Sequence, residues 1–273
     1  MFLRKLFDYN IFSPMKKIGV YFLSKTNVVL WAKLHNGQKL KVDLSSTVGR
    51  SIYLRGCYEY DVEKELKKNL NPGDVFFDIG ANVGYFTLTS QELVGEKGEV
   101  HSFEPHDRAF SLLQESVKSN KCDNIFLNKT ALSDKEKAVE FVSLKDSAFS
   151  WTQQERNNSS PSVTIKTTTL DKYINDINLN RKIKSLKIDV EGAEYNVLLG
   201  AKELLMSQSP YLILEVQDWS LSRFGYSVDD IFTFLDKCGY RAFDLDGNSV
   251  LNAAQARQHL QKQWVKNLLF KKD

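Results

Sequence analysis

The sequence predicts an α/β fold in which a mostly parallel sheet is covered by helices on both faces. Three observations lead to this prediction: five short apolar runs, helical stretches between them, and a glycine-containing loop after the first run. The runs cover residues 75–79, 99–103, 125–127, 186–189 and 211–215. The helical stretches cover residues 84–94, 106–119 and 192–206. Strands that alternate with helices are typical of a parallel sheet that is buried on both sides.

The composition is that of an ordinary globular protein. The chain has 273 residues, of which 42% are hydrophobic and 26% are charged, and its net charge is +3. These values exclude a disordered or collagen-like chain, and the small net charge does not by itself indicate nucleic-acid binding. No apolar run approaches the roughly 20 residues of a membrane span. Because Cys57, Cys122 and Cys238 form no CxxC motif or Cys/His cluster, we expect a reducing, cytoplasmic location.

Residues 1–55 are expected to form an N-terminal extension that consists of a short helix and a β-hairpin. The segment 27–44 contains two apolar stretches around Asn36-Gly37, which is a strong hairpin signal. Residues 1–24 mix aromatic and basic side chains, which suits either a helix packed on the protein body or a weak contact with a membrane surface. Pro14 weakens the membrane interpretation, because proline interrupts helices.

The rest of the chain divides into a main domain, 56–250, and a C-terminal helix, 251–273, that packs on it. The main domain should begin with a helix over 59–70, and a polar loop at 153–161 is expected to be mobile or to face substrate. The other expected elements are strands at 139–144 and 163–169, a helix at 228–238, a strand at 240–245, a turn at 246–248 and a polar helix at 252–269.

The loop from Asp78 to Gly84 is the most informative segment of the sequence. Ligands of open α/β sheets bind beyond the carboxyl ends of the strands, where this loop is expected. Gly80 and Gly84 would let the backbone approach a ligand without a clash at Cβ. Their G-x-x-x-G spacing matches neither the dinucleotide fingerprint nor a P-loop, so a phosphate-binding role is not indicated.

Two acidic residues favour a nucleoside that carries a cation. Asp78 lies at the end of the first strand, where a carboxylate would repel a pyrophosphate but would suit an amino group or a sulfonium. Glu104 lies at the end of the second strand, where an acid can accept hydrogen bonds from both ribose hydroxyls. This pair of acids without a phosphate-binding signature predicts S-adenosylmethionine as the cofactor.

Several motifs between residues 56 and 217 carry a family resemblance. They are Gly56-Cys57-Tyr58-Glu59, Pro72 to Tyr85, Phe103-Glu104-Pro105, Asn128 to Asp134, Thr169-Leu170-Asp171 and Leu186 to Glu194. Through them the chain resembles the FkbM-like family of S-adenosylmethionine-dependent methyltransferases. The resemblance implies a Rossmann-like class I methyltransferase fold with a seven-stranded sheet. It also implies methyl transfer to a hydroxyl, often on a sugar, a glycolipid or a polyketide.

The predicted cofactor site lies at the ends of the strands. Its residues are Asp78, Gly80, Asn82, Gly84, Glu104, Pro105, Ala131 and Asp189. Ala131 belongs to a turn that resembles the adenine-contacting loop of the family, in which backbone groups would contact the base.

Asp189 is the predicted general base, because it ends the fourth strand beside the expected position of the methyl group. Glu215, at the end of the fifth strand, is the second candidate. Together with Gln217 these two residues could instead form an oxygen-rich magnesium site. The resemblance does not require a metal, and none is predicted.

The candidate acceptor contacts are Arg55, Tyr58, Glu59 and Trp219, because aromatic faces and charged hydrogen-bonding groups suit a sugar ring. Core packing is the alternative for the two aromatic residues. The predicted activity is O-methylation of a small molecule, a sugar or a glycolipid. The alternatives are N-methylation and a scaffold that binds the cofactor without catalysis, because a fold does not by itself determine an activity.

Overall fold

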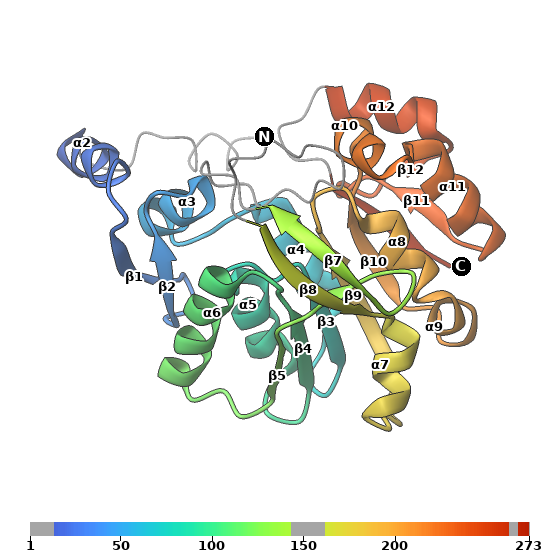
Figure 1. The fold of residues 1–273 in the computed structure, drawn as a ribbon, viewed down its shortest axis with the longest axis horizontal. Helices are drawn as coiled ribbons and strands as arrows, with labels where there is room; N and C mark the ends of the chain where they lie inside the picture. The colour runs from blue at the N-terminus through green and yellow to red at the C-terminus, as the bar shows by residue number, and fades with distance from the viewer. Residues whose placement is uncertain (1–13, 143–161, 262–266, 273) are drawn as a thin grey trace.

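The computed structural model describes residues 14–142, 162–261 and 267–272, and its centre is an eight-stranded sheet (Figure 1). The strand order is β12-β11-β13-β10-β9-β3-β4-β5. The strands are β3 (Val75–Ile79), β4 (Glu99–Phe103), β5 (Ile125–Asn128), β9 (Ile183–Ile188), β10 (Tyr211–Glu215), β11 (Arg241–Phe243), β12 (Ser249–Val250) and β13 (Asn267–Lys271).

The five strands predicted from apolar runs form the parallel part of this sheet. They lie in the order β10-β9-β3-β4-β5, and all pairings among them are parallel. In β3 all five residues are buried, with Phe77 packed in the core of one face and Phe76 in the core of the other. The α/β prediction is therefore confirmed, and the sheet has one strand more than predicted because the two-residue β12 pairs with β11.

Helices cover both faces of the sheet (Figure 1). The described helices are α2 (Pro14–Leu23), α3 (Thr47–Arg55), α4 (Tyr60–Asn69), α5 (Tyr85–Val94), α6 (Asp107–Asn120), α7 (Leu170–Asp176), α8 (Glu194–Leu199), α9 (Lys202–Ser207), α10 (Asp218–Leu221), α11 (Val228–Lys237) and α12 (Ala253–Gln261), with a 3-10 turn at Ser222–Phe224. The core with Phe76 contains α4, α5 and α6, and the core with Phe77 contains α8, α9 and α11. Each face of the sheet therefore has its own hydrophobic core.

The predicted hairpin near the N-terminus is confirmed. Strands β1 (Val29–Lys33) and β2 (Lys39–Asp43) pair in antiparallel fashion around the Asn36-Gly37 turn. The buried residues Leu40 and Val42 of β2 belong to the same core as α6. The first 13 residues of the extension lie outside the described residues.

A small second sheet contains the strands expected near residues 139–144 and 163–169. Its order is β6-β8-β7, with β6 (Ala131–Leu132) parallel to β8 (Ser162–Thr168) and β7 (Lys137–Val142) antiparallel to it. The two strands are confirmed. The polar loop at 153–161 lies outside the described residues.

Two helix predictions need correction. The helix expected over 192–206 is two short helices, α8 and α9, which are separated at Gly200, where a Cβ would lie 2.0 Å from the Ser133 carbonyl oxygen. The segment expected to be one helix over 252–269 contains α12, described over Ala253–Gln261, and residues 267–271, which form β13 inside the sheet. Leu268 to Phe270 form a short apolar run that is buried on both faces, and periodicity alone cannot distinguish such a run from a buried helix.

None of the helices within the described ranges is both long enough and apolar enough to cross a lipid bilayer.

Candidate active site

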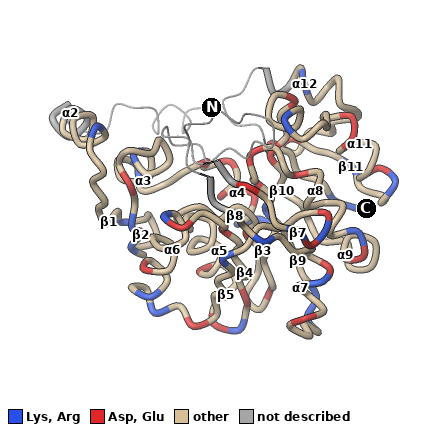
Figure 2. The backbone as a smooth tube through the Cα atoms, viewed as in Figure 1, with Lys and Arg blue, Asp and Glu red and all other residues tan. Residues whose placement is uncertain are grey.

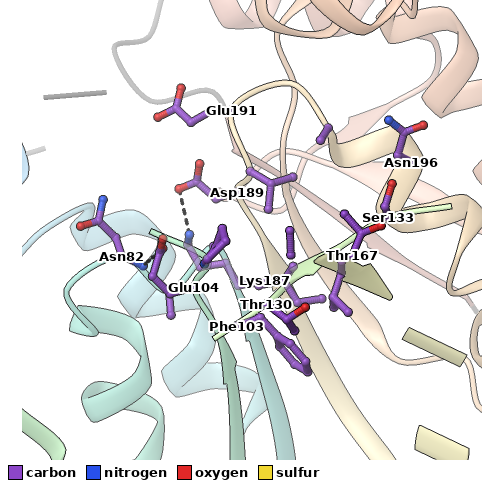
Figure 3. A pocket seen from close by; sticks show the side chains of 18 of the residues that line it. Asn82, Phe103, Glu104, Thr130, Ser133, Thr167, Lys187, Asp189, Glu191 and Asn196 are labelled. Atoms are coloured by element: carbon purple, nitrogen blue, oxygen red, sulfur yellow. Dashed lines mark hydrogen bonds and ion pairs between the residues drawn. The ribbon is translucent and has the colours of Figure 1, made fainter. Parts of the chain in front are cut away.

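A cavity of about 350 Å³ lies beyond the carboxyl ends of β3, β4 and β9 (Figure 3). One wall consists of residues that follow these strands: Gly80 after β3, Glu104 after β4 and Asp189 after β9. Another wall comes from the small sheet, with Val139 from β7 and Thr167 from β8. This is the size of a small-molecule site, and its position is the one predicted for ligands of open α/β sheets.

The two glycines of the loop after β3 are required by contacts within the protein. Gly80 has a φ of +83°, and a Cβ there would lie 1.8 Å from the carbonyl oxygen of Asp189. Gly84 has a φ of +95°, and a Cβ there would lie 2.3 Å from Leu113 Cδ1 on α6. Gly80 lines the cavity, whereas Gly84 does not. The physical reason given for the glycines therefore needs correction: both allow chain segments to pack closely.

Glu104 is held by backbone N–H groups from two segments. The Asn82 N–H donates to Glu104 Oε2 at 2.7 Å, and the His106 N–H donates to Oε1 at 2.8 Å. Asn82 presents its N–H from a left-handed conformation with a φ of +49°. Burial raises the pKa of Glu104 to about 7, although the two hydrogen bonds act in the opposite direction. Because the carboxylate lines the cavity, its remaining lone pairs can accept hydrogen bonds from a ligand.

Three further predicted cofactor contacts differ in their placement. Pro105 and Ala131 line the cavity, whereas Asp78 does not. Asp78 is fully buried behind the glycine loop, where its Oδ2 accepts a hydrogen bond from Thr87 Oγ1 at 2.6 Å. Its Oδ1 has no hydrogen-bond partner among the described residues. Burial raises the pKa of Asp78, and the charge of Lys187 opposes this effect. Asp78 therefore interacts electrostatically with Lys187, which lines the cavity.

Asp189 is paired with a buried lysine, as Figure 3 shows. Lys187 Nζ lies 2.9 Å from Asp189 Oδ2 and 4.8 Å from the centre of the Phe86 ring. Burial disfavours the ammonium, but the surrounding carboxylates, Asp189 first, hold the pKa of Lys187 above its ordinary value. The pair therefore fixes the position of the Asp189 carboxylate at the cavity wall.

The turn after Asp189 places the next two glutamates in different surroundings. Glu194 is buried, and its Oε1 accepts hydrogen bonds from the N–H groups of Val190 and Gly192, each at 3.0 Å. Glu191 has a left-handed φ of +56° and lines the cavity. Burial, followed by the nearby charge of Asp189, raises the pKa of Glu191 to about 7.

Glu215, the second candidate base, is not among the residues that line the cavity. It accepts a hydrogen bond from Gln217 Nε2, and burial together with nearby acids, Asp189 first, raises its pKa. No group of three His, Cys, Asp or Glu side chains that could hold a metal ion occurs in the described ranges.

Two of the predicted acceptor contacts lie together at the start of α4. Tyr58 lines the cavity. Glu59 precedes α4 with a φ of +42°, and Asn267 Nδ2 of β13 donates to its Oε2 at 3.3 Å. Burial, followed by the charge of Asp189, raises the pKa of Glu59. The structure thus brings Tyr58 and Glu59 to the site but does not place Glu59 on the cavity surface.

The other two predicted acceptor contacts do not line the cavity. Arg55 ends α3, and its carbonyl oxygen accepts a hydrogen bond from His35 Nε2 at 2.7 Å. Trp219 is 50% exposed; its Nε1 donates to Gln217, and the Arg223 guanidinium lies 4.3 Å from its ring centre. Neither residue meets the cavity in this arrangement.

Two groups of residues that line the cavity are not predicted from the sequence. The first group consists of Lys187 and Glu191, and the second of polar residues of the small sheet and its flanks. The second group contains Thr130, Ser133, Lys137, Glu140 and Thr167. A signal existed for Lys187, because residues i and i+2 of a strand share a face, which places it beside Asp189. The second group depends on how the small sheet packs against the large one, which local patterns do not specify.

One protein-family profile matches the chain. The profile of the Methyltransferase FkbM domain matches residues 78–242, which is more than half of the chain. The matched region contains the glycine loop, Glu104, Asp189 and Glu191. No curated protein sequence matches the chain.

Several solved structures are similar to the chain at low identity. One is methyltransferase FkbM from Methylobacillus flagellatus KT, with 13% identity, a TM-score of 0.46, and coverage of 94% of this chain and 59% of that chain. Another is M. jannaschii TYW2 in complex with AdoMet, with 13% identity, a TM-score of 0.46, and coverage of 90% of this chain and 85% of that one. A third is a SAM-dependent methyltransferase from Aquifex aeolicus, with 15% identity, a TM-score of 0.39, and coverage of 78% and 86%.

Proposed function

This chain belongs to the FkbM methyltransferase family and is a methyltransferase, and from this premise we propose that it transfers the methyl group of S-adenosylmethionine to a hydroxyl oxygen. The proposed acceptor is a sugar, a glycolipid or another small molecule. The carrying observation is a buried glutamate, Glu104, that lines a cavity beyond the strand ends while two backbone N–H groups hold it in place.

The proposed cofactor orientation follows from the chemistry of the cavity walls. Glu104 is an acceptor of hydrogen bonds and suits the two ribose hydroxyls. Pro105 and Ala131 provide an apolar surface for the adenine on the same side. Gly80 and Asp189 then lie at the methionine end, where a carboxylate suits the positive charge of the sulfonium and the amino group.

Methyl transfer needs alignment more than activation, because the sulfonium is already a reactive methyl donor. The acceptor oxygen, the methyl carbon and the sulfur must lie in line. An aliphatic hydroxyl is a weak nucleophile, so a carboxylate that removes its proton would assist the reaction. Of the two bases predicted from the sequence, Asp189 lines the cavity and Glu215 does not, so Asp189 is retained at the transfer end.

The test of the proposed function is methyl transfer from S-adenosylmethionine that carries a trideuterated methyl group. The acceptor panel contains alkyl glycosides, a glycolipid extract, alkyl amines and carboxylic acids. We expect a labelled methyl ether on a hydroxyl-bearing acceptor, together with S-adenosylhomocysteine. A label on nitrogen would replace the proposal by N-methylation, and binding of S-adenosylhomocysteine without any transfer would favour a non-catalytic scaffold.

We also propose a weak contact between the N-terminal extension and an anionic membrane surface, which would suit a glycolipid acceptor. Residues 1–41 contain eight basic residues and one acidic residue, a formal charge of +7 in a chain whose net charge is +3. Figure 2 shows basic positions along β1 and β2, beside α2. On α2, Tyr21 is 60% exposed and Phe22 is 66% exposed. Exposed aromatic groups next to basic residues suit the interface of an anionic bilayer.

Vesicle sedimentation tests this contact. We expect binding to vesicles that contain phosphatidylglycerol, weaker binding at high salt, and a loss of binding in Phe22→Ser. The matched control is Met206→Ser on α9, because Met206 is 56% exposed but lies outside the extension. Equal vesicle binding by Phe22→Ser and Met206→Ser would contradict the proposed membrane contact and would not affect the methyltransferase assignment.

A further inference from the structure

We propose that Glu191 takes the proton from the acceptor hydroxyl during methyl transfer, and that the Lys187–Asp189 ion pair positions the transfer end of the cavity. The inference rests on the proposed O-methyl transfer. It moves the general base two residues along the chain from the position that the strand-end rule predicts.

Three acidic residues of one turn have three different sets of partners. Asp189 is paired with the buried ammonium of Lys187 at 2.9 Å. Glu194 accepts hydrogen bonds from two backbone N–H groups and so closes the turn. Glu191 lines the cavity, and no hydrogen bond or ion pair joins its side chain to another residue within the part of the chain that the structure describes. A proton acceptor needs a free lone pair at the cavity. Protonation of Glu191 would break no hydrogen bond or ion pair of the described residues, whereas protonation of Asp189 would weaken its ion pair with Lys187.

The backbone holds Glu191 in place despite an unfavourable conformation. Glu191 has a φ of +56°, which is uncommon for a residue with a side chain, and such conformations persist where their surroundings impose them. The next residue, Gly192, has a φ of +113°, and a Cβ there would lie 2.3 Å from the carbonyl oxygen of Ser220 on α10. Two features therefore restrain the turn: its close packing against α10 and the hydrogen bonds that Glu194 accepts from its backbone. Figure 3 shows the Glu191 and Asp189 side chains projecting on the same side of the site.

The charges around Glu191 suit a base that works near neutral pH. Burial and the neighbouring Asp189 raise its pKa to about 7, while Arg223 from the 3-10 turn and Lys187 from β9 act in the opposite direction. Glu215 at the end of β10 also faces this group, because the charge of Glu191 contributes to its raised pKa. A carboxylate in this range is charged in a large fraction of molecules at neutral pH and is still basic enough to accept a proton.

The step balances without a further reactant. The acceptor oxygen forms a bond to the methyl carbon while the carbon–sulfur bond breaks and its electron pair stays on sulfur. The hydroxyl proton moves to the Glu191 carboxylate. The products are the methyl ether, neutral S-adenosylhomocysteine and a protonated Glu191, which returns its proton to water when the products leave.

The first test compares Glu191→Gln with Glu194→Gln and Asp189→Asn, using the first acceptor that the wild-type protein methylates in the panel above. In Glu191→Gln we expect turnover to fall by about a hundredfold to ten-thousandfold. Its affinity for S-adenosylhomocysteine should change by less than about threefold, and the acidic limb of the turnover–pH profile should disappear. Glu191→Gln that keeps both its turnover and the acidic limb would overturn the inference.

The control variants separate a base from a structural residue. Glu194→Gln should lower the unfolding temperature and yet keep the acidic limb, because Glu194 holds the turn. Asp189→Asn should raise the KM for the acceptor or lower the affinity for the cofactor, while the acidic limb of the turnover–pH profile remains. If the acidic limb disappears in Asp189→Asn alone, Asp189 rather than Glu191 is the general base.

A second test needs no acceptor, so it separates this inference from the proposed function. Carbon-13 NMR of glutamate carboxyl groups, assigned with Glu191→Gln, should show that Glu191 titrates near pH 7 in the free protein. A titration near the ordinary glutamate value would overturn the inference even if methyl ethers form. Failure of every acceptor to react would instead count against the proposed function.

Discussion

The two ends of the cavity contain the same kind of group in contrasting surroundings. At the nucleoside end, the carboxylate of Glu104 is held by backbone N–H groups of Asn82 and His106. At the transfer end, Asp189 is paired with a buried ammonium, and Glu191 lines the cavity from a turn with a left-handed backbone. Burial raises the pKa of both Glu104 and Glu191 to about 7. The same raised pKa thus accompanies different partners, although Glu104 is buried and Glu191 is half-buried.

The comparison indicates that the partners of each carboxylate, rather than its raised pKa, distinguish the proposed binding role of Glu104 from the proposed reaction role of Glu191. A carboxylate whose lone pairs are partly taken by N–H groups is rigid and suits recognition of a hydroxyl pair. A carboxylate that would lose an ion pair on protonation is a poor proton acceptor, whereas one without such a partner is available for the proton. Substitutions at each end of the cavity test this contrast.

Gly80→Val should have the largest effect, because Gly80 packs directly against the backbone of Asp189. A Cβ there would lie 1.8 Å from the Asp189 carbonyl oxygen, and the residue has a φ of +83°. We expect loss of the folded protein or destabilisation by more than about 4 kcal/mol, measured by thermal unfolding. Gly73→Ala is the matched control, since Gly73 has a φ of +93° but nothing within 4 Å of a Cβ. If both variants unfold alike, the close approach of the two loops is not the cause.

Lys187→Met should destabilise the protein by about 3–5 kcal/mol at pH 8, because it leaves buried carboxylates without their counter-charge. Without the ammonium the folded-state pKa of the Asp78 carboxyl, which burial already raises and Lys187 lowers, rises further. A carboxyl whose folded pKa is raised costs stability above its unfolded pKa, so the loss should shrink as the pH falls towards 5.

Urea unfolding at the two pH values measures this effect. Lys172→Met, which removes an exposed ion pair with Asp176, is the control and should leave the unfolding curve nearly unchanged. A loss that does not depend on pH would mean that Lys187 contributes packing rather than charge.

Glu104→Gln should weaken S-adenosylhomocysteine binding by about tenfold to a hundredfold, because hydrogen bonds to a charged group contribute about 1.5–3 kcal/mol. The amide also places N–H groups against the backbone donors of Asn82 and His106. Asn82→Gly keeps both the donor and the positive φ and should retain most of the affinity. Calorimetry measures the affinity of both variants. An unchanged affinity in Glu104→Gln would show that Glu104 does not bind the ribose hydroxyls.

Trp219→Ala should have the smallest effect, because Trp219 is half exposed and does not line the cavity. Affinity for S-adenosylhomocysteine should stay within about twofold. A rise in KM for the acceptor alone would support the sequence-based prediction that Trp219 contacts a sugar ring. A change in cofactor affinity would show that the cavity extends to α10.

Local sequence patterns were sufficient to predict the parallel strands and to place Gly80 and Glu104 at the cavity. The runs at 75–79 and 99–103 are apolar because both faces of these strands are buried, and each ends in a residue that meets the cavity. Gly80 and Glu104 could be located because a strand end fixes where its next residue lies. The physical reason for Gly80 could not, because its close neighbour is the carbonyl of a residue more than a hundred positions away.

The transfer end could be predicted only in part. Asp189 follows from the strand-end rule, but the distinction between Glu191 and Glu194 depends on the turn conformation and on contacts with α10. The strand at 267–271 was missed because Leu268 to Phe270 are buried on both faces, so that they show no alternation. In each case the missing information concerns distant segments that meet only in the folded protein.

A crystal structure of the chain with S-adenosylhomocysteine tests the central claim, the different roles of the two ends, most directly. The account predicts the ribose hydroxyls within hydrogen-bond distance of Glu104, the adenine against Pro105 and Ala131, and the sulfur directed towards Asp189 and Glu191. A reversed orientation, with the homocysteine part at Glu104, or a ligand bound outside the cavity, would contradict it.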